Sequence, residues 1–186
     1  MTIPSKDIAP RAYFIEIDHD GGFLRTGFEK TGASNPTPNK DYAEKIGKAN
    51  WISQLIKKEA NQKTADDYFK TAQDLLNQVL KPSPNNFEAN YEMGMLYINS
   101  VAQNRTTYSK LNIELVKTND KNKQALANAQ KAHILKQHKE ALKSFQIAER
   151  IKPTERKVLI QIADIYAFAN NSAKAKEYRA KGGARG

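Results

Sequence analysis

The apolar residues of this chain follow a helical period from Asp41 to Tyr178, and this period constrains the fold more than any other feature. Within this stretch they recur three or four positions apart. Such spacing places side chains on one face of an α-helix. Pro82 and Pro153 interrupt the pattern, because proline cannot continue a helix. Residues 41–181 are therefore predicted to form short α-helices that pack through one face.

One part of the pattern has the spacing of a known repeat. Ala141, Phe145 and Ala148 are followed by Pro153, and Ala175 lies 34 residues after Ala141. This arrangement is similar to the second helix of a tetratricopeptide repeat, whose period is 34 residues. In that family two small residues and one aromatic residue let paired helices cross closely, and the proline ends the second helix.

The first helix of that repeat resembles three segments: Met93-Gly94-x-x-Tyr97, Ile162-Ala163-x-x-Tyr166 and, more weakly, Ile52-Ser53-x-x-Ile56. Ala65, Phe69 and Ala72 follow the weaker match at the positions of a second helix. The resemblance covers residues 41–181. It implies an all-α fold, a short α-solenoid of antiparallel helix pairs.

The number of pairs depends on the middle of the chain. Phe87 and Arg156 are 69 positions apart, close to two periods, which favours four helix pairs. These pairs would span 41–81, 87–118, 121–153 and 156–181. A turn near residues 136–139 would then be needed, yet this stretch contains no glycine. The alternative is one long helix over 121–152, with 104–118 as an insertion.

Two local features add detail to this prediction. Thr64 is followed by Asp66 and Asp67, which is typical of a helix start with Thr64 as its N-cap. Further on, Ala125, Ala129 and Ala132 are predicted to form one apolar stripe with Ala141, Phe145 and Ala148.

Residues 1–40 have a different pattern. The segment 12–17 is rich in β-branched and aromatic residues, a turn signal follows at 20–22, and 23–28 could return as a second strand. We expect an extended N-terminal arm or β-hairpin, then a linker. An isolated hairpin is only marginally stable, so it would need a surface to pack on. Residues 182–186 are predicted to be a disordered tail.

The net charge of +10 is unevenly distributed. Residues 121–186 contain 15 Lys/Arg and only 5 Asp/Glu, whereas residues 1–120 contain 15 of each. Such a basic segment favours an acidic partner, whether protein, nucleic acid or anionic membrane, although a solvated helix face would have the same composition. No apolar stretch approaches the ~20 residues that a membrane span needs. A cytoplasmic location is expected, with export and removal of a leader as the alternative.

No pattern indicates catalysis, a cofactor or a metal site. The chain has no cysteine, and none of the common nucleotide-binding, zinc-protease or serine-hydrolase motifs occurs. Asp18, His19 and Asp20 are adjacent, so in a strand or turn they point in alternate directions. His133 and His138 lie five apart, whereas two ligands on one helical face need a spacing of three or four. We expect no enzymatic activity.

The resemblance also implies a binding surface. First helices of the repeat family line a concave groove that accepts a peptide. Carried over by position, the groove residues are Glu88, Tyr91, Met95, Ile98, Asn99, Lys157, Ile160, Asp164 and Phe168. A four-pair version would add Lys123, Leu126, Gln130 and His133. The apolar members are not expected to be needed for core packing, and exposed apolar surface usually marks an interface. Alternatively, the N-terminal arm fills the groove.

These expectations predict a non-enzymatic scaffold or adaptor that binds a protein or peptide segment. An acidic segment and a place in a larger assembly are further expectations. The alternative is a nucleic-acid-associated factor that uses the basic C-terminal half. Helical-repeat RNA readers use a recurring set of side chains in each repeat, and no such set is visible. The basic segment also has few aromatic residues on which bases could stack.

Overall fold

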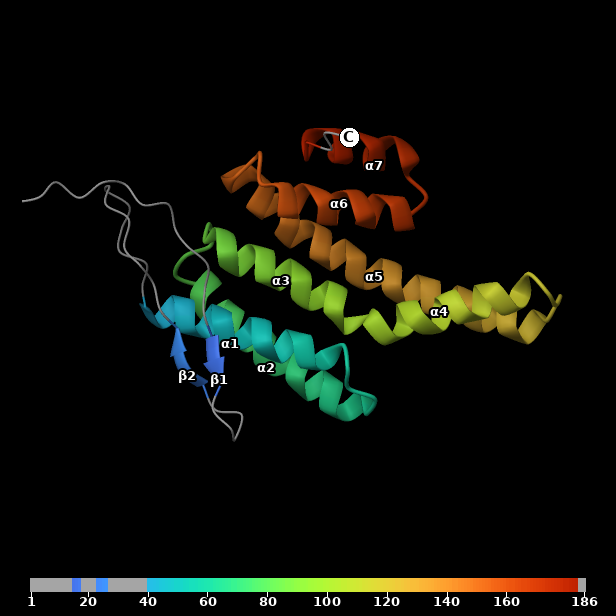
Figure 1. The fold of residues 1–186 in the computed structure, drawn as a ribbon, viewed down its shortest axis with the longest axis horizontal. Coiled ribbons are helices and arrows are strands. Elements are labelled where there is room, and N and C mark those ends of the chain that lie inside the picture. The colour runs from blue at the N-terminus through green and yellow to red at the C-terminus, as the bar shows by residue number, and fades with distance from the viewer. Residues whose placement is uncertain (1–14, 18–22, 27–39, 184–186) are drawn as a thin grey trace, which may run out of the picture.

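The computed structural model describes residues 15–17, 23–26 and 40–183, and over these residues the fold is all-α apart from one short hairpin (Figure 1). The helices are α1 Lys40–Ile56, α2 Gln62–Leu80, α3 Phe87–Ser100, α4 Ala102–Leu115, α5 Lys121–Ile151, α6 Arg156–Phe168 and α7 Ser172–Lys181. The strands are β1 Ile15–Ile17 and β2 Phe23–Thr26, which pair antiparallel with Ile15 opposite Thr26. The remainder of the predicted N-terminal arm lies outside the described residues.

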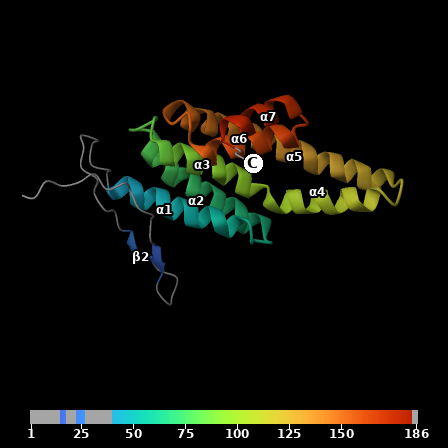
Figure 2. The same ribbon diagram turned by 45° about the horizontal axis from the view of Figure 1, so that its top comes forward.

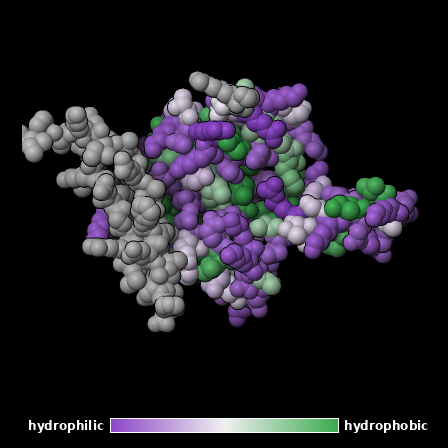
Figure 3. Space-filling view, viewed as in Figure 1, coloured by the Kyte–Doolittle hydropathy of each residue, from purple (hydrophilic) through white to green (hydrophobic). Residues whose placement is uncertain are grey.

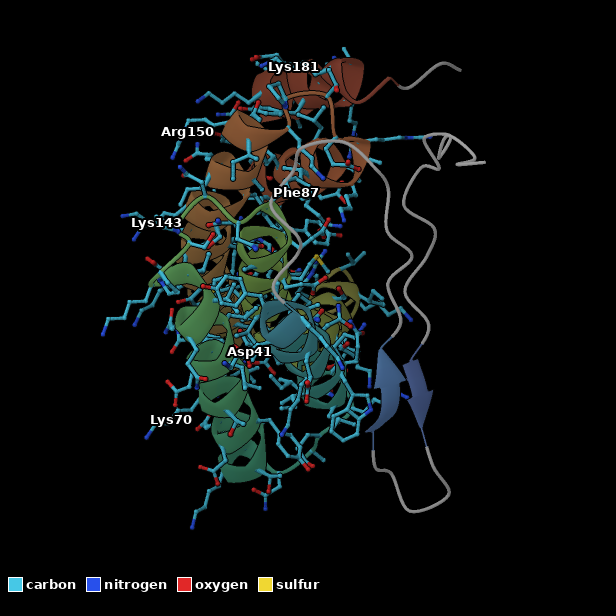
Figure 4. The ribbon with its side chains drawn as sticks, turned by 90° about the vertical axis from the view of Figure 1, so that its left-hand side faces the viewer. Asp41, Lys70, Phe87, Lys143, Arg150 and Lys181 are labelled. Carbon is cyan, nitrogen blue, oxygen red and sulfur yellow. The ribbon has the colours of Figure 1, made fainter. Side chains whose placement is uncertain are left out.

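The helices stack in antiparallel pairs. α1 packs with α2, α3 with the C-terminal half of α5, and α6 with α7. Figure 4 views the molecule along its long axis, with Phe87 at the start of α3 lying between the α1–α2 pair and the α6–α7 pair. Two buried apolar clusters hold the layers together, one centred on α1, α2 and α3 and the other on α3, α5 and α6.

The prediction of four helix pairs is wrong, because α5 is one continuous helix of 31 residues. Residues 136–139 contain neither glycine nor proline, so nothing in the backbone ends the helix there. The alternative with one long helix is the correct one. The 69 positions between Phe87 and Arg156 hold α3, α4 and the long α5, rather than two helix pairs.

The buried face of α5 also differs from the predicted stripe. Its buried positions are Ala127, Ile134, His138, Ala141, Phe145 and Ala148. In an unbroken helix the face of Ala141 continues backward in steps of three, four and seven residues, as these positions do. Ala125, Ala129 and Ala132 fall on the other side and are exposed, so the prediction that they share one stripe with Ala141 is wrong.

The N-terminus of α2 lies slightly earlier than predicted. The helix begins at Gln62, and Asn61 is its N-cap. The Asn61 side-chain oxygen accepts a hydrogen bond from the backbone N–H of Thr64 at 3.1 Å. An Asn at this position satisfies one of the free N–H groups of the first turn. Thr64 is therefore inside the helix, and its prediction as N-cap is wrong.

α3 and α5 cross closely, and Gly94 faces Phe145 at this crossing. A Cβ atom placed on Gly94 would lie 2.5 Å from Cε1 of Phe145, well inside van der Waals contact. Ala141, Phe145 and Ala148 are all fully buried here, and Tyr166 packs against them. Ala141, Phe145 and Ala148 thus lie together at the crossing, and Tyr166 is partly buried against them.

Gly94→Ala is expected to lower the free energy of unfolding by about 1–2 kcal/mol, measured by urea denaturation. Replacing glycine in a helix normally gains up to about 1 kcal/mol from propensity. Here overpacking against Phe145, which costs about 1–3 kcal/mol, outweighs that gain. In a Phe145→Leu background the loss should shrink or reverse. Equal losses in both backgrounds would contradict the proposed steric contact.

α4 and residues 121–137 of α5 form a helical hairpin that extends beyond the rest of the stack, and we refer to it as the projecting hairpin (Figure 2). Nothing in α4 is fully buried. The two arms are joined by a hydrogen bond from Asn104 Nδ2 to Gln130 Oε1 at 2.8 Å. An ion pair between Lys123 and Glu114, at 2.6 Å, joins them again near the tip.

Candidate interaction face on the first helices

The predicted groove residues lie on α3 and α6, the first helices of the second and third pairs. α1, the first helix of the first pair, packs directly against α3. α3 starts at a capped turn, in which the Asn86 side chain accepts a hydrogen bond from the Ala89 N–H at 2.9 Å. We refer to the surface formed by α1, α3 and α6 as the first-helix face.

Lys157 joins α3 to α6 at their N-terminal ends. Its Nζ lies 3.1 Å from Glu88 Oε2 and 4.4 Å from the centre of the Tyr91 ring. Lys152, from the turn before α6, lies 4.0 Å from Glu88 Oε1 and 4.0 Å from the centre of the Phe87 ring. Two cations thus flank one carboxylate and two aromatic rings at this end of the face.

Tyr91 is half-buried, and its ring centre lies 5.8 Å from that of Phe145. Burial, with smaller contributions from the carboxylates of Glu92, Glu88 and Glu155, raises the pKa of Tyr91 to about 12. The phenol therefore stays neutral over the physiological range. It can pack and donate a hydrogen bond, but it has no charge to offer a partner.

The apolar groove residues are less exposed than predicted. Tyr91, Met95 and Ile98 pack against the buried cluster around Phe145, so the expectation that core packing does not need them is wrong. Asn99 is buried, and its amide donates a hydrogen bond to the Ser53 hydroxyl of α1 at 2.8 Å. The first-helix face is thus partly a helix-packing surface, because α1 and α5 both pack against α3.

The α6 residues of the face are more accessible. Ile160 is exposed, with 37% of its surface accessible, and it is the exposed large apolar side chain of this face. Asp164 is also exposed, and Arg179 of α7 lies 3.4 Å from its carboxylate. These two residues lie one helical turn apart, so they face the same side of α6.

Phe168 ends the face at its other extremity. Its ring centre is 5.7 Å from that of Tyr108 and 5.0 Å from that of His138, both in edge-on geometry. The Arg105 guanidinium also lies over it, at 5.8 Å. Phe168 therefore joins α6 to the base of the projecting hairpin and is half-buried by it.

One polar pair on the face was not predicted. The Asn50 amide of α1 donates a hydrogen bond to Glu92 Oε2 of α3 at 2.6 Å. Burial raises the pKa of Glu92, and the hydrogen bond from Asn50 opposes that shift. The weak match at Ser53 contained the signal, because Asn50 precedes Ser53 by the same three residues as Tyr91 precedes Gly94.

The residues that a third pair would have added to the groove are elsewhere. Lys123, Leu126, Gln130 and His133 all lie on the projecting hairpin. His133 lines a cavity of about 110 Å³ beside the start of α2, together with Gln62, Asp66 and Gln137. They do not contribute to the first-helix face.

Comparison of the chain with models of protein families, with curated proteins and with solved structures finds no match. Function must therefore be inferred from the chain's own geometry. In the part of the chain that the structure describes, no three His, Asp or Glu side chains converge as metal ligands. Asp18, His19 and Asp20 lie outside that part. Among the described helices none is long and apolar enough to cross a membrane.

Proposed function

We propose that this chain is a non-enzymatic protein-interaction scaffold of the tetratricopeptide type, which binds a peptide or protein segment along its first-helix face. The observation that carries the proposal is the crossing of α3 and α5, where Gly94 admits the Phe145 ring. Helical repeats of this type expose an extended surface built from successive first helices. Such a surface is suited to binding an extended or helical segment.

The spacing of small residues supports three repeats, the middle one interrupted. Ser53 precedes Ala65 by 12 residues, and Ala163 precedes Ala175 by 12. In the middle pair, Gly94 precedes Ala141 by 47, an excess of 35 residues. The segment 103–137 has that length and coincides with the projecting hairpin. We therefore interpret the hairpin as an insertion between the two helices of the second repeat.

The side chains left accessible favour a protein ligand over a nucleic acid. Among the described residues, the exposed large apolar side chains are all aliphatic, whereas Tyr91 and Phe168 are half-buried. Single-stranded nucleic acids are bound largely by stacking on accessible aromatic rings. An exposed aliphatic anchor at Ile160 suits a segment that presents an apolar side chain.

Ile160→Glu is expected to reduce recovery of the partner from the native source by at least about tenfold, because a charge replaces the apolar anchor. The substitution avoids Tyr91 and Phe168, since both support the core. Ile113→Glu is the matched control, because Ile113 is another exposed isoleucine that lies far from α6 on the projecting hairpin. Circular dichroism would verify that both variants remain helical. Undiminished recovery with Ile160→Glu would reject the first-helix face as the binding site.

The nucleic-acid alternative has a distinct signature. Phosphate binding weakens steeply with added salt. If charge reversal at Lys174 and Lys176 abolishes partner recovery, and nuclease treatment does the same, the basic C-terminal segment is the functional surface. If the scaffold proposal holds, charge reversal slows association only at low salt, because distant charges are screened at higher ionic strength.

A further inference from the structure

The end of the projecting hairpin holds most of the exposed aliphatic surface in the described part of the chain. Ile113 is 64% exposed, Val116 87% and Leu126 47%, and the other such residue is Ile160 on α6. Figure 3 shows hydrophobic side chains gathered on this projection, away from the main body of the stack. We refer to Ile113, Val116 and Leu126 as the tip patch.

Positive charge surrounds the tip patch. Lys110, Lys117 and Lys121 are exposed, and none of them makes an ion pair within the described residues. The two acidic residues nearby are already engaged. Glu114 pairs with Lys123, and the Asp120 carboxylate accepts hydrogen bonds from the first N–H groups of α5. The tip therefore presents aliphatic side chains among uncompensated cations.

The tip patch is built on a formed scaffold. Ile113 lies in the last turn of α4, and Leu126 lies in the second turn of α5. Ala127 is buried between the arms, and the Lys123–Glu114 ion pair crosses them. Because Ile113 and Leu126 are held on two packed helices and Val116 directly follows α4, little ordering is needed when they bind.

We propose that the tip of the projecting hairpin binds the surface of an anionic lipid membrane end-on, with the tip patch entering the interface and the lysines contacting headgroup phosphates. Aliphatic residues combined with lysines are the composition of helices that lie at a membrane surface. Basic residues next to an apolar surface add attraction to anionic lipids. The projection of the hairpin lets its end reach a flat surface before the rest of the stack does (Figure 2).

The composition of the tip favours lipid over a protein partner. Between Lys110 and Leu126 there is no aromatic residue and no arginine. Protein interfaces are enriched in Tyr, Trp and Arg and depleted in Lys, and their strongest contacts come from the enriched types. A second copy of the chain is also disfavoured as the occupant, because two lysine-rich tips would repel each other.

Sedimentation with large unilamellar vesicles tests the proposal. Wild-type protein should bind vesicles of phosphatidylglycerol and phosphatidylcholine, and should not bind vesicles of phosphatidylcholine alone. Replacing the tip patch by Ile113→Asn, Val116→Asn and Leu126→Asn should weaken binding by at least about tenfold, as loss of inserted aliphatic side chains does. Ile160→Asn, the control, should bind like wild type.

The contribution of charge is tested by matched neutralisation. Lys110→Gln, Lys117→Gln and Lys121→Gln together should weaken vesicle binding, by about fivefold for each lysine. Lys48→Gln, Lys70→Gln and Lys176→Gln remove the same charge from exposed sites on the body of the protein and should have little effect. Equal losses from both triples would overturn the proposal in favour of diffuse attraction by net charge.

The absence of cysteine allows a second readout of orientation. Val116→Cys and Ala180→Cys, each labelled with an environment-sensitive fluorophore, place a single reporter on the tip or on exposed α7. Only the tip label should shift to the blue on addition of anionic vesicles. The proposal is overturned if neither label responds, if both respond equally, or if wild-type protein fails to bind anionic vesicles; in this last case the tip patch would be assigned to an acidic protein instead.

Discussion

Phe145→Ala is expected to lower the free energy of unfolding by roughly 3–5 kcal/mol, as large-to-small changes in a well-packed core do. Phe145 is fully buried, and its ring fills the space left by Gly94. It also contacts the Tyr91 ring, so three elements of the stack lose packing together. Because a domain is stable by only about 5–15 kcal/mol in total, urea denaturation should show a large fall in the midpoint.

Leu126→Ala provides the control for this measurement. It also truncates a large apolar residue on α5, but Leu126 is 47% exposed, and such surface changes usually cost less than about 0.5 kcal/mol. A loss below ~1 kcal/mol for Phe145→Ala would mean that the helix register is wrong. Loss of the α3–α5 contact would then also remove the main support for the tetratricopeptide proposal.

The local parts of the fold could be predicted because they depend on neighbouring residues. The spacing from Ala141 through Phe145 to Ala148 places these side chains on one helical face, and Pro153 ends that helix nearby. Pairing of α1 with α2 and of α6 with α7 follows from the short connections between them. These contacts hold regardless of how the middle of the chain is arranged.

The middle of the chain could not be predicted as easily, because the projecting hairpin has nearly the length of one repeat period and so has the spacing of another helix pair. The stretch 136–139 gave the one local signal, since it contains no residue that ends a helix. With the helix continuous, His138 falls on the buried face and Ala132 on the exposed one. Whether α5 has a turn at 136–139 therefore determines the predicted burial of the residues that precede this stretch in α5.

The predicted accessibility of the first-helix face also depends on whether α5 is continuous. Phe168 seemed free for a partner because its cover, Tyr108 and Arg105, comes from the inserted hairpin. Tyr91 was predicted to be accessible because the spacing of residues in the sequence does not show that Phe145 packs opposite Gly94 and against the Tyr91 ring. Long-range packing, rather than helix propensity, determined which predicted site residues remain accessible.

His138 is the buried polar residue that this packing leaves without a hydrogen-bond partner. It is 2% exposed, and neither ring nitrogen finds a partner among the described residues. It lies where α5 meets Phe168 of α6, with the Arg105 cation of α4 nearby. Burial, and then the charge of Arg105, lowers the pKa of His138 to about 4, so the imidazole is neutral at physiological pH.

The free energy of unfolding should therefore fall as the pH drops from about 6.5 toward 4. In the unfolded chain a histidine has a pKa near 6.5. Between about pH 4 and 6.5 the imidazole is therefore protonated in the unfolded state and neutral in the folded state. Near and below pH 4, protonation of His138 should have lowered the free energy of unfolding by a total of about 3 kcal/mol relative to neutral pH. Urea denaturation at several pH values would measure the slope.

His138→Leu isolates this contribution from those of other groups. The raised pKa of Glu92 acts in the opposite direction, since protonation of that buried carboxyl on acidification favours the folded state. Both proteins share Glu92, so the difference between their curves reports His138 alone. The variant should also be more stable at pH 7, because it removes two buried nitrogens without partners. Parallel curves for the two proteins between pH 4 and 6.5 would contradict the prediction. They would show that His138 binds a proton as readily in the folded protein, at the junction of α4, α5 and α6, as in the unfolded chain.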